Sequence, residues 1–257
     1  MKKVRLIDLS IPLKNFSMEG PNFSPQIIRW DCYETARRRC SASGINPQDI
    51  PGGMHLFSDW VSLSTHSGTH VDAPLHFGPT CEGRPSKSID QIPLEWCYGD
   101  GVVLDVTHRE AGEIIQAEDL KKALEKINHR LEPGEIVLIR TDATRHYDEP
   151  NFDLIAPGMG RESVLWLLDQ GIRTMGIDAN NFDVSDFYMG KRFKEGARDQ
   201  WFQCHYLGRE REYIHVEKLV NLDQLPRPTG FQVFLFPVKV EKGSGGWCRA
   251  VAIVPEK

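Results

Sequence analysis

The chain has 257 residues, of which 40% are hydrophobic and 26% are charged, with a formal net charge of −5 and a pI near 6.0. This composition is typical of a globular protein, and the slight acidity argues against nucleic acid or an anionic membrane as partner. No stretch approaches the ~20 apolar residues that span a bilayer. The N-terminal apolar run is short and interrupted by Asp8, so it does not match a secretory signal. We therefore expect a cytoplasmic protein, and six scattered cysteines without a Cys-x-x-Cys pair fit reduced thiols.

Strand patterns and a few helix patterns follow one another along the chain. The first strand pattern covers residues 4–13, and a Pro- and Gly-rich region up to residue 53 contains one short helix pattern at 33–40. Further strand patterns lie at 60–66, 101–107, 135–142, 172–178, 213–217, 231–240 and 249–255, with helix patterns at 116–128 and 161–171 and a glycine-rich separator at 242–247. Strands outnumber helices, and helices fall between strands in the middle. We expect one α/β domain over residues 1–257 with a mixed sheet, and no nucleotide-binding glycine motif follows a strand.

The densest group of reactive side chains is the stretch THSGTHVDAPLHF, residues 65–77. His66, His70, Asp72 and His76 all have even numbers, so an extended chain would point them to one face. A lone histidine is usually a core or surface residue, but three beside a carboxylate on one face indicate a metal or acid/base site. The expected extended geometry excludes the helical His-Glu-x-x-His arrangement of zinc proteases.

A straight strand would place His66 and Asp72 ~20 Å apart, too far for one ion with bonds of ~2.0–2.2 Å. We therefore expect the chain to bend at Ser67-Gly68, because glycine tolerates the required backbone geometry. The bend would bring His66, His70 and Asp72 to one ion, with His76 as a neighbouring contact or proton carrier. Nitrogen and oxygen ligands of this kind suit Zn²⁺, Mn²⁺ or Fe²⁺, and the residue types do not choose among them.

The pattern His-x-Gly-Thr-His-x-Asp-x-Pro-x-His at residues 66–76 resembles the signature of the cyclase family of metal-dependent hydrolases, which includes bacterial kynurenine formamidases and isatin hydrolases. Residues 157–178, with a Pro-Gly, a helix and a Gly-Ile-Asp run, and residues 205–226 are similar to later parts of that family. Of these two branches, the isatin hydrolases are the closer look-alike, judging by residues 93–108 and 236–253. His215 departs from the formamidase pattern, which carries an aliphatic residue there; it would share the face of Glu217, as a further ligand or, as we favour, in a structural role.

The resemblance implies a swivelling β/β/α domain that assembles as a dimer or tetramer. It implies a first divalent ion on His66, His70 and Asp72, and a second on Asp72, His205 and Glu217. His76 would be the catalytic acid/base residue. Zinc or manganese is the implied metal, with two ions per chain favoured because both His205 and Glu217 are present.

A small-molecule substrate with an amide, lactam or ester carbonyl, attacked by metal-activated water, follows from the resemblance. Alternatives are a cyclase or lyase acting on a polyketide-like chain, a non-haem iron oxygenase using His70, Asp72 and His205, and a non-catalytic protein in which the metal only stabilises the fold. An aromatic substrate is plausible because several aromatic residues lie near the motifs, and three arginines are candidates for a substrate carboxylate. These are Phe23, Phe57, Trp60, Phe77 and Trp201, and Arg161, Arg192 and Arg198.

Overall fold

The computed structural model describes residues 3–15 and 25–256. Phe23, one of the candidate aromatic residues, lies outside the described residues. No helix within the described ranges combines the length and the apolar character that crossing a membrane requires.

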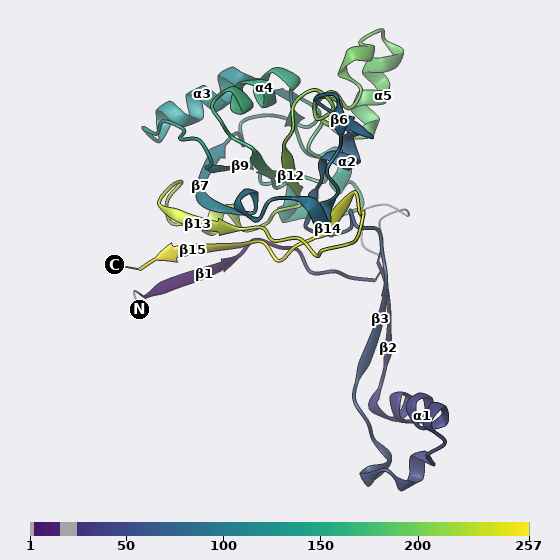
Figure 1. Cartoon of the computed structure of the whole chain (residues 1–257). Helices are drawn as coiled ribbons and strands as arrows, with labels where there is room; N and C mark the ends of the chain where they lie inside the picture. Colours follow the sequence, from purple (N-terminus) through teal and green to yellow (C-terminus); the bar gives the residue numbers. More distant parts are fainter. Residues whose placement is uncertain (1–2, 16–24, 257) are drawn as a thin grey trace.

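A nine-stranded mixed sheet forms the body of the molecule (Figure 1). Its strands, in spatial order, are β1 (Val4–Asp8), β15 (Val251–Pro255), β13 (Phe231–Phe234), β7 (Tyr98–Asp105), β9 (Ile136–Arg140), β11 (Thr174–Ile177), β12 (Ile214–Glu217), β4 (His70–Asp72) and β14 (Gly245–Trp247). The central strands β7, β9, β11 and β12 are parallel, and the strands on either side are antiparallel. The expected α/β class with a mixed sheet is confirmed.

Both faces of the parallel strands are buried, which explains why their sequences are nearly continuous apolar runs. Val102 and Leu104 of β7 belong to the apolar cluster beneath helices α3 (Ala117–Lys126) and α4 (Arg161–Asp169), which cover one face (Figure 1). Val103 belongs to a second cluster together with residues of β1, β13 and β15. The remaining helices and two-stranded pairs are α2 (Pro74–Phe77), α5 (Asp186–Lys194), α6 (Gln203–Leu207), β5 (Thr80–Cys81) with β6 (Arg84–Pro85), and β8 (Ile114–Ile115) with β10 (Gly158–Met159).

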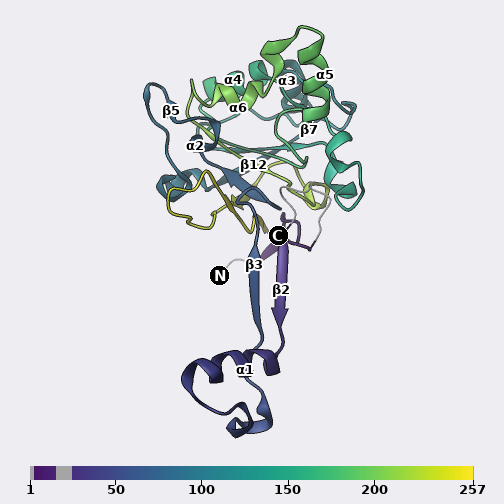
Figure 2. The ribbon, with the colours of Figure 1, turned by 90° about the vertical axis from the view of Figure 1, so that its right-hand side faces the viewer.

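A two-stranded arm extends away from the sheet (Figures 1 and 2). It consists of β2 (Gln26–Trp30) paired antiparallel with β3 (Ser58–Ser62), and α1 (Cys32–Ser43) lies at its far end. The helix predicted at 33–40 is therefore confirmed and is longer. The strand predicted at 60–66 is displaced: β3 pairs with β2 and ends at Ser62, and the chain then passes through turns before β4 begins.

The glycine-rich segment 242–247 was predicted as a separator, but its second half is strand β14, which pairs with β4. Glycine permits this close approach, since a Cβ atom at Gly245 would lie 2.7 Å from Cε1 of His66 and 3.0 Å from the Val71 carbonyl oxygen. The run predicted at 231–240 pairs as a strand only over β13. The body thus places the three-residue strand β4 between β12 and β14, and this position organises the site.

Candidate metal centre

The stretch around His66 changes direction twice. Gly68 adopts a φ of +61°, a left-handed value that glycine tolerates, so the predicted bend is confirmed. The prediction of an extended chain through residue 76 is wrong, because only His70–Asp72 is a strand. Pro74 opens the short helix α2, which carries His76, since proline fits the first position of a helix.

Strand β12 supplies the facing side chains. In the antiparallel pairing of β4 with β12, His215 lies opposite Asp72 and Glu217 lies opposite His70. Because alternate residues of a strand share a face, all four side chains meet on one side of the sheet. His205 joins them from the short helix α6.

The carboxylate of Asp72 stands at the centre of the group, and its two oxygens face different partners. Oδ1 lies 2.6 Å from His66 Nδ1 and 3.2 Å from His70 Nε2. Oδ2 lies 2.9 Å from His215 Nε2, 3.8 Å from His205 Nε2 and 3.8 Å from His76 Nε2. Oδ1 thus faces His66 and His70, whereas Oδ2 faces His205, His215 and His76.

His70 provides a direct test of whether these residues fit a metal ion. Its Nδ1 donates a hydrogen bond to the Gly68 carbonyl oxygen at 2.8 Å, which leaves the Nε2 lone pair directed at the carboxylates. Nε2 is buried and has no hydrogen-bond partner among the described residues. A buried nitrogen acceptor surrounded by carboxylate oxygens is poorly satisfied by the protein alone, and a divalent cation would satisfy it.

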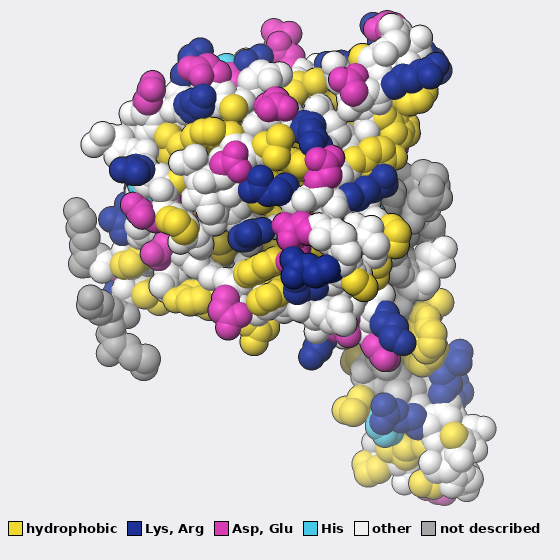
Figure 3. Space-filling view, turned by 45° about the horizontal axis from the view of Figure 1, so that its top comes forward, with side chains coloured by type: hydrophobic (Ala, Val, Ile, Leu, Met, Phe, Trp, Pro, Cys, Tyr) yellow, Lys and Arg dark blue, Asp and Glu magenta, His cyan; other side chains and the backbone are white. Residues whose placement is uncertain are grey.

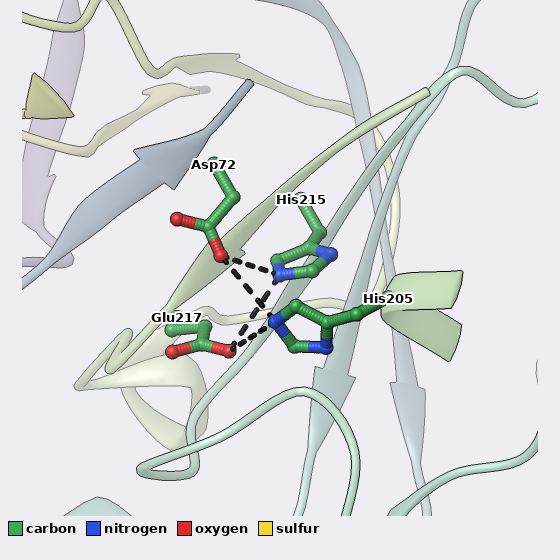
Figure 4. Close-up of side chains that lie close together, drawn as sticks. All are labelled: Asp72, His205, His215 and Glu217. Carbon is green, nitrogen blue, oxygen red and sulfur yellow. Dashed lines mark hydrogen bonds and ion pairs between the residues drawn. The ribbon is translucent and has the colours of Figure 1, made fainter. Parts of the chain in front are cut away.

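Four buried side chains form a second compact set: Asp72, His205, His215 and Glu217 (Figure 4). One ligand atom of each lies within 4.8 Å of all the others. His215 Nε2 is 3.5 Å and His205 Nε2 is 4.0 Å from Glu217 Oε1. Tetrahedral bonds of about 2.0–2.1 Å would place ligand atoms roughly 3.3 Å apart, so the observed spacing needs only small adjustments. A further set of the same compactness contains His66, Asp72 and His76.

The electrostatics of this group favour a cation. Burial alone would raise the pKa of Asp72, but His76 and His70 nearby and hydrogen bonds from His215 and His66 hold it well below its usual range. Burial would likewise lower the pKa of His215, but its contacts with Asp72 and Glu217 raise it to about 9. The two buried carboxylates therefore stabilise positive charge placed between them.

Outer contacts hold the side chains of His205, His215 and Glu217 in position. Asp183 Oδ2 accepts a hydrogen bond from His205 Nδ1 at 2.6 Å, and the Phe182 backbone N–H donates to Glu217 Oε1 at 2.8 Å. The Phe182 ring stacks on His215 at 4.2 Å between centroids. A carboxylate behind a metal-binding histidine is a common feature of metal sites, because it fixes the ring and raises its basicity. No pattern in the sequence pointed to Asp183 or Phe182.

A cavity of about 400 Å³ opens over the centre, and its lining includes His66, His70, His76 and Phe202. The aromatic residues proposed from sequence lie elsewhere: Phe77 is buried against the rings of His205 and His215, Phe57 and Trp60 are exposed on the arm, and Trp201 packs against Phe193. The three candidate arginines are also engaged away from the lining. Arg161 pairs with Glu210, Arg192 donates to the Gly112 carbonyl oxygen, and Arg198 lies over the Phe193 ring.

Comparison with known proteins places the chain in a family. Residues 7–184 match the sequence profile of the family described as "Putative cyclase", so the chain belongs to the cyclase family. It is 28% identical over 221 residues to an isatin hydrolase of Roseibium aggregatum, covering 82% of this chain and 80% of that protein. It is 27% identical over 252 residues to a kynurenine formamidase of Bacillus mycoides, covering 98% of each. Isatin hydrolase A from Ralstonia solanacearum superposes with a TM-score of 0.76 at 25% identity, over 98% of this chain and 92% of the other.

The family resemblance drawn from residues 66–76 is thus confirmed. His205, His215 and Glu217 lie beyond the range that the family profile matches. Their association with the centre rests on the pairing of β4 with β12 and on α6.

Proposed function

We propose that the protein is a metal-dependent hydrolase that cleaves the C–N bond of a small amide or cyclic amide, or the corresponding ester bond. The observation that carries the proposal is the unpaired His70 Nε2 beside Asp72 and Glu217 on the floor of the cavity. The relatives named isatin hydrolase and kynurenine formamidase support hydrolysis of this kind.

Two ion positions account for the ligand atoms around Asp72. His66, His70 and Asp72 Oδ1 would hold one ion, and Asp72 Oδ2, His205 and Glu217 would hold the other, with Zn²⁺ or Mn²⁺ as the metal. His215 Nε2 lies closer to this second set than His205 Nε2 does, at 2.9 Å against 3.8 Å from Asp72 Oδ2 and 3.5 Å against 4.0 Å from Glu217 Oε1, so it is a further candidate ligand. A bound divalent ion supplies Lewis acidity, which makes water a nucleophile near neutral pH and polarises the substrate carbonyl.

His76 is the proposed acid/base residue. It is the most exposed histidine of the group, with 33% of its side chain accessible, and its Nε2 lies 3.8 Å from Asp72 Oδ2. Burial lowers the pKa of His76 to about 4, and nearby His66 and His205 add to this effect while Asp72 opposes it. The ring is therefore neutral at pH 7 and able to accept a proton from water. It would then donate that proton to the leaving nitrogen or oxygen.

The cavity wall bears on the substrate. Phe202 supplies the cavity with an aromatic surface, which supports a small aromatic substrate.

We also propose that the protein assembles as a homodimer or homotetramer. On the arm, Ile28 and Trp60 lie opposite each other and are exposed, and Figure 3 shows hydrophobic side chains exposed there. A two-stranded hairpin of this kind is marginal in water without a packing partner. Light scattering would report the mass in solution.

The test of the proposed function is the metal content of protein purified without added metal, measured together with hydrolysis of isatin, N-formylkynurenine and an aryl ester before and after chelation. About two equivalents of Zn²⁺ or Mn²⁺, and turnover that chelation abolishes and metal restores, are expected. A product that has gained one water molecule relative to the substrate separates a hydrolase from a cyclase or lyase. A protein without metal, or with turnover indifferent to chelation, would overturn the proposal.

A further inference from the structure

The cavity over the candidate metal centre has a buried floor and an exposed rim, and both carry carboxylates. The floor consists of the histidines, Asp72 and Glu217. The rim consists of the segment from Asn180 to Asp186, which leads into α5, together with Pro150 and Asp153. Asp153 and Asp186 are both exposed at the rim and carry carboxylates.

Two polar atoms at the same rim lack partners within the described part of the chain. Oγ of Ser185 has no hydrogen bond although its residue is only 7% exposed, and the buried Oδ1 of Asn180 has none either. Both residues line the cavity. Buried polar atoms are nearly always paired, so these two are suited to a ligand. Asn180 Oδ1 and the two carboxylates can only accept hydrogen bonds, and the Ser185 hydroxyl can accept as well.

Positive charge is scarce at this rim. Lys218 is the one lysine or arginine among the described residues of the lining, and it is held at the floor, with Nζ 3.2 Å from the His66 carbonyl oxygen and 3.8 Å from Glu217 Oε2. The N-terminus of α5 contributes a partial positive charge of about half a unit. Asp186, the first residue of that helix, places a carboxylate beside it. Asp153, Asp186 and Glu217 line the same cavity. Burial raises the pKa of Asp186, His205 opposes this effect, and Glu217 and Asp153 add to it.

We propose that the rim selects substrates that carry an amino group, protonated at neutral pH, at the end remote from the scissile carbonyl, and that it disfavours a carboxylate there. The inference rests on the proposed function and specifies its substrate class. The ammonium group would donate hydrogen bonds to Asp153, Asp186 and Asn180 Oδ1. With divalent ions bound at the floor, the floor would receive the electron-rich carbonyl while the rim carboxylates hold the ammonium group, and this would orient the substrate.

Three formanilides that differ only in the para substituent test this selection: aminomethyl, hydroxymethyl and carboxylate. We expect kcat/KM to fall in that order, with the aminomethyl substrate about tenfold above the hydroxymethyl one at low salt, as expected for a partly screened ion pair. The preference should shrink as salt is added, since rim charges are exposed. Equal kcat/KM for the three substrates, or a preference for the carboxylate, would overturn the inference and leave the proposed function standing.

Substitutions at the rim show which residues cause the preference for the aminomethyl substrate. Asp186→Asn and Asp153→Asn should each lower the ratio of aminomethyl to hydroxymethyl kcat/KM roughly three- to tenfold, through KM. Glu118→Gln is the matched control: it removes the same charge from the exposed face of α3, where Glu118 faces Lys121 at 3.7 Å, and should keep the ratio. Calorimetry with benzylamine and benzyl alcohol gives a readout that needs no turnover. If no formanilide is hydrolysed, hydrolysis of open-chain formamides fails, and tighter benzylamine binding that Asp186→Asn abolishes would still support the proposed selectivity of the rim.

Discussion

The metal centre has two halves that are built differently. One half, His66, His70 and His76, comes from a single short stretch and reaches the cavity through a turn, a strand and a one-turn helix. The other half, His205, His215 and Glu217, is buried throughout, and neighbouring groups fix its side chains. Asp72 lies between the halves: Oδ1 faces His66 and His70, and Oδ2 faces His215.

This difference indicates a division of roles. His76, the most exposed member of the first half, is suited to contact with water and substrate and to proton transfer. The buried half, whose side chains are held by Asp183, Phe182 and the β4–β12 pairing, would be suited to holding an ion in fixed geometry. Variants that affect both halves, or only one of them, test this comparison.

Asp72→Asn should have the largest effect, because it removes the charge shared by both halves while keeping the side-chain volume. We expect loss of both ions and of all metal-dependent turnover, measured by elemental analysis and by hydrolysis assays. Glu135→Gln is the control, since it removes a carboxylate that pairs with His129 at 3.0 Å away from the centre. Retention of two ions in Asp72→Asn would contradict a bridging role.

His76→Ala should lower kcat by roughly 10²–10⁴-fold, the usual contribution of a general acid/base. Metal content should stay the same, because His76 lies on the open side of the first half. His129→Ala provides a histidine control remote from the cavity. Full kcat in His76→Ala would remove it from the mechanism, and a lost ion would make it a ligand.

His215→Leu should weaken the binding of one ion by about 10–100-fold or more and leave the other ion in place. The loss is expected whether His215 binds the ion or holds Asp72 Oδ2 at 2.9 Å. Competition with a chelator of known affinity measures the change, and X-ray absorption counts the histidine ligands before and after substitution. An unchanged dissociation constant would assign His215 to packing between Phe182 and Phe77 alone.

Asp183→Asn should have the smallest effect. The amide keeps the shape and can still accept from His205 Nδ1, but it lacks the charge that raises the basicity of the ring. We expect roughly tenfold weaker binding of the ion in the buried half. Asp183→Ala, which removes the acceptor altogether, should exceed that effect. If both variants bind metal with the affinity of the unmodified protein, Asp183 does not strengthen ion binding by His205.

Much of this arrangement could be predicted from sequence where the signal is local. Apolar runs gave β7, β9 and β11, and a glycine between two histidines gave the bend at Gly68. The helical start at Pro74 was missed, because an alternating pattern continued past it. Strand β14 was missed because its glycines carry no apolar pattern. A glycine is needed at Gly245 because a Cβ atom there would collide with His66. His215 was noticed but favoured as structural, since only the register of β4 on β12 brings it to Asp72. Asp183 depends on the placement of a loop, which no periodicity encodes.

The position of β4 between β12 and β14 also has a consequence for the order of folding. The histidines of residues 66–76 leave the ribosome long before their sheet partners, because Asp72 pairs with His215 and with Gly245. Contacts of such large sequence separation form late and slowly. During synthesis the stretch therefore stays without its neighbours until most of the chain has been made, and tight binding of the proposed ions would be one of the last steps of maturation.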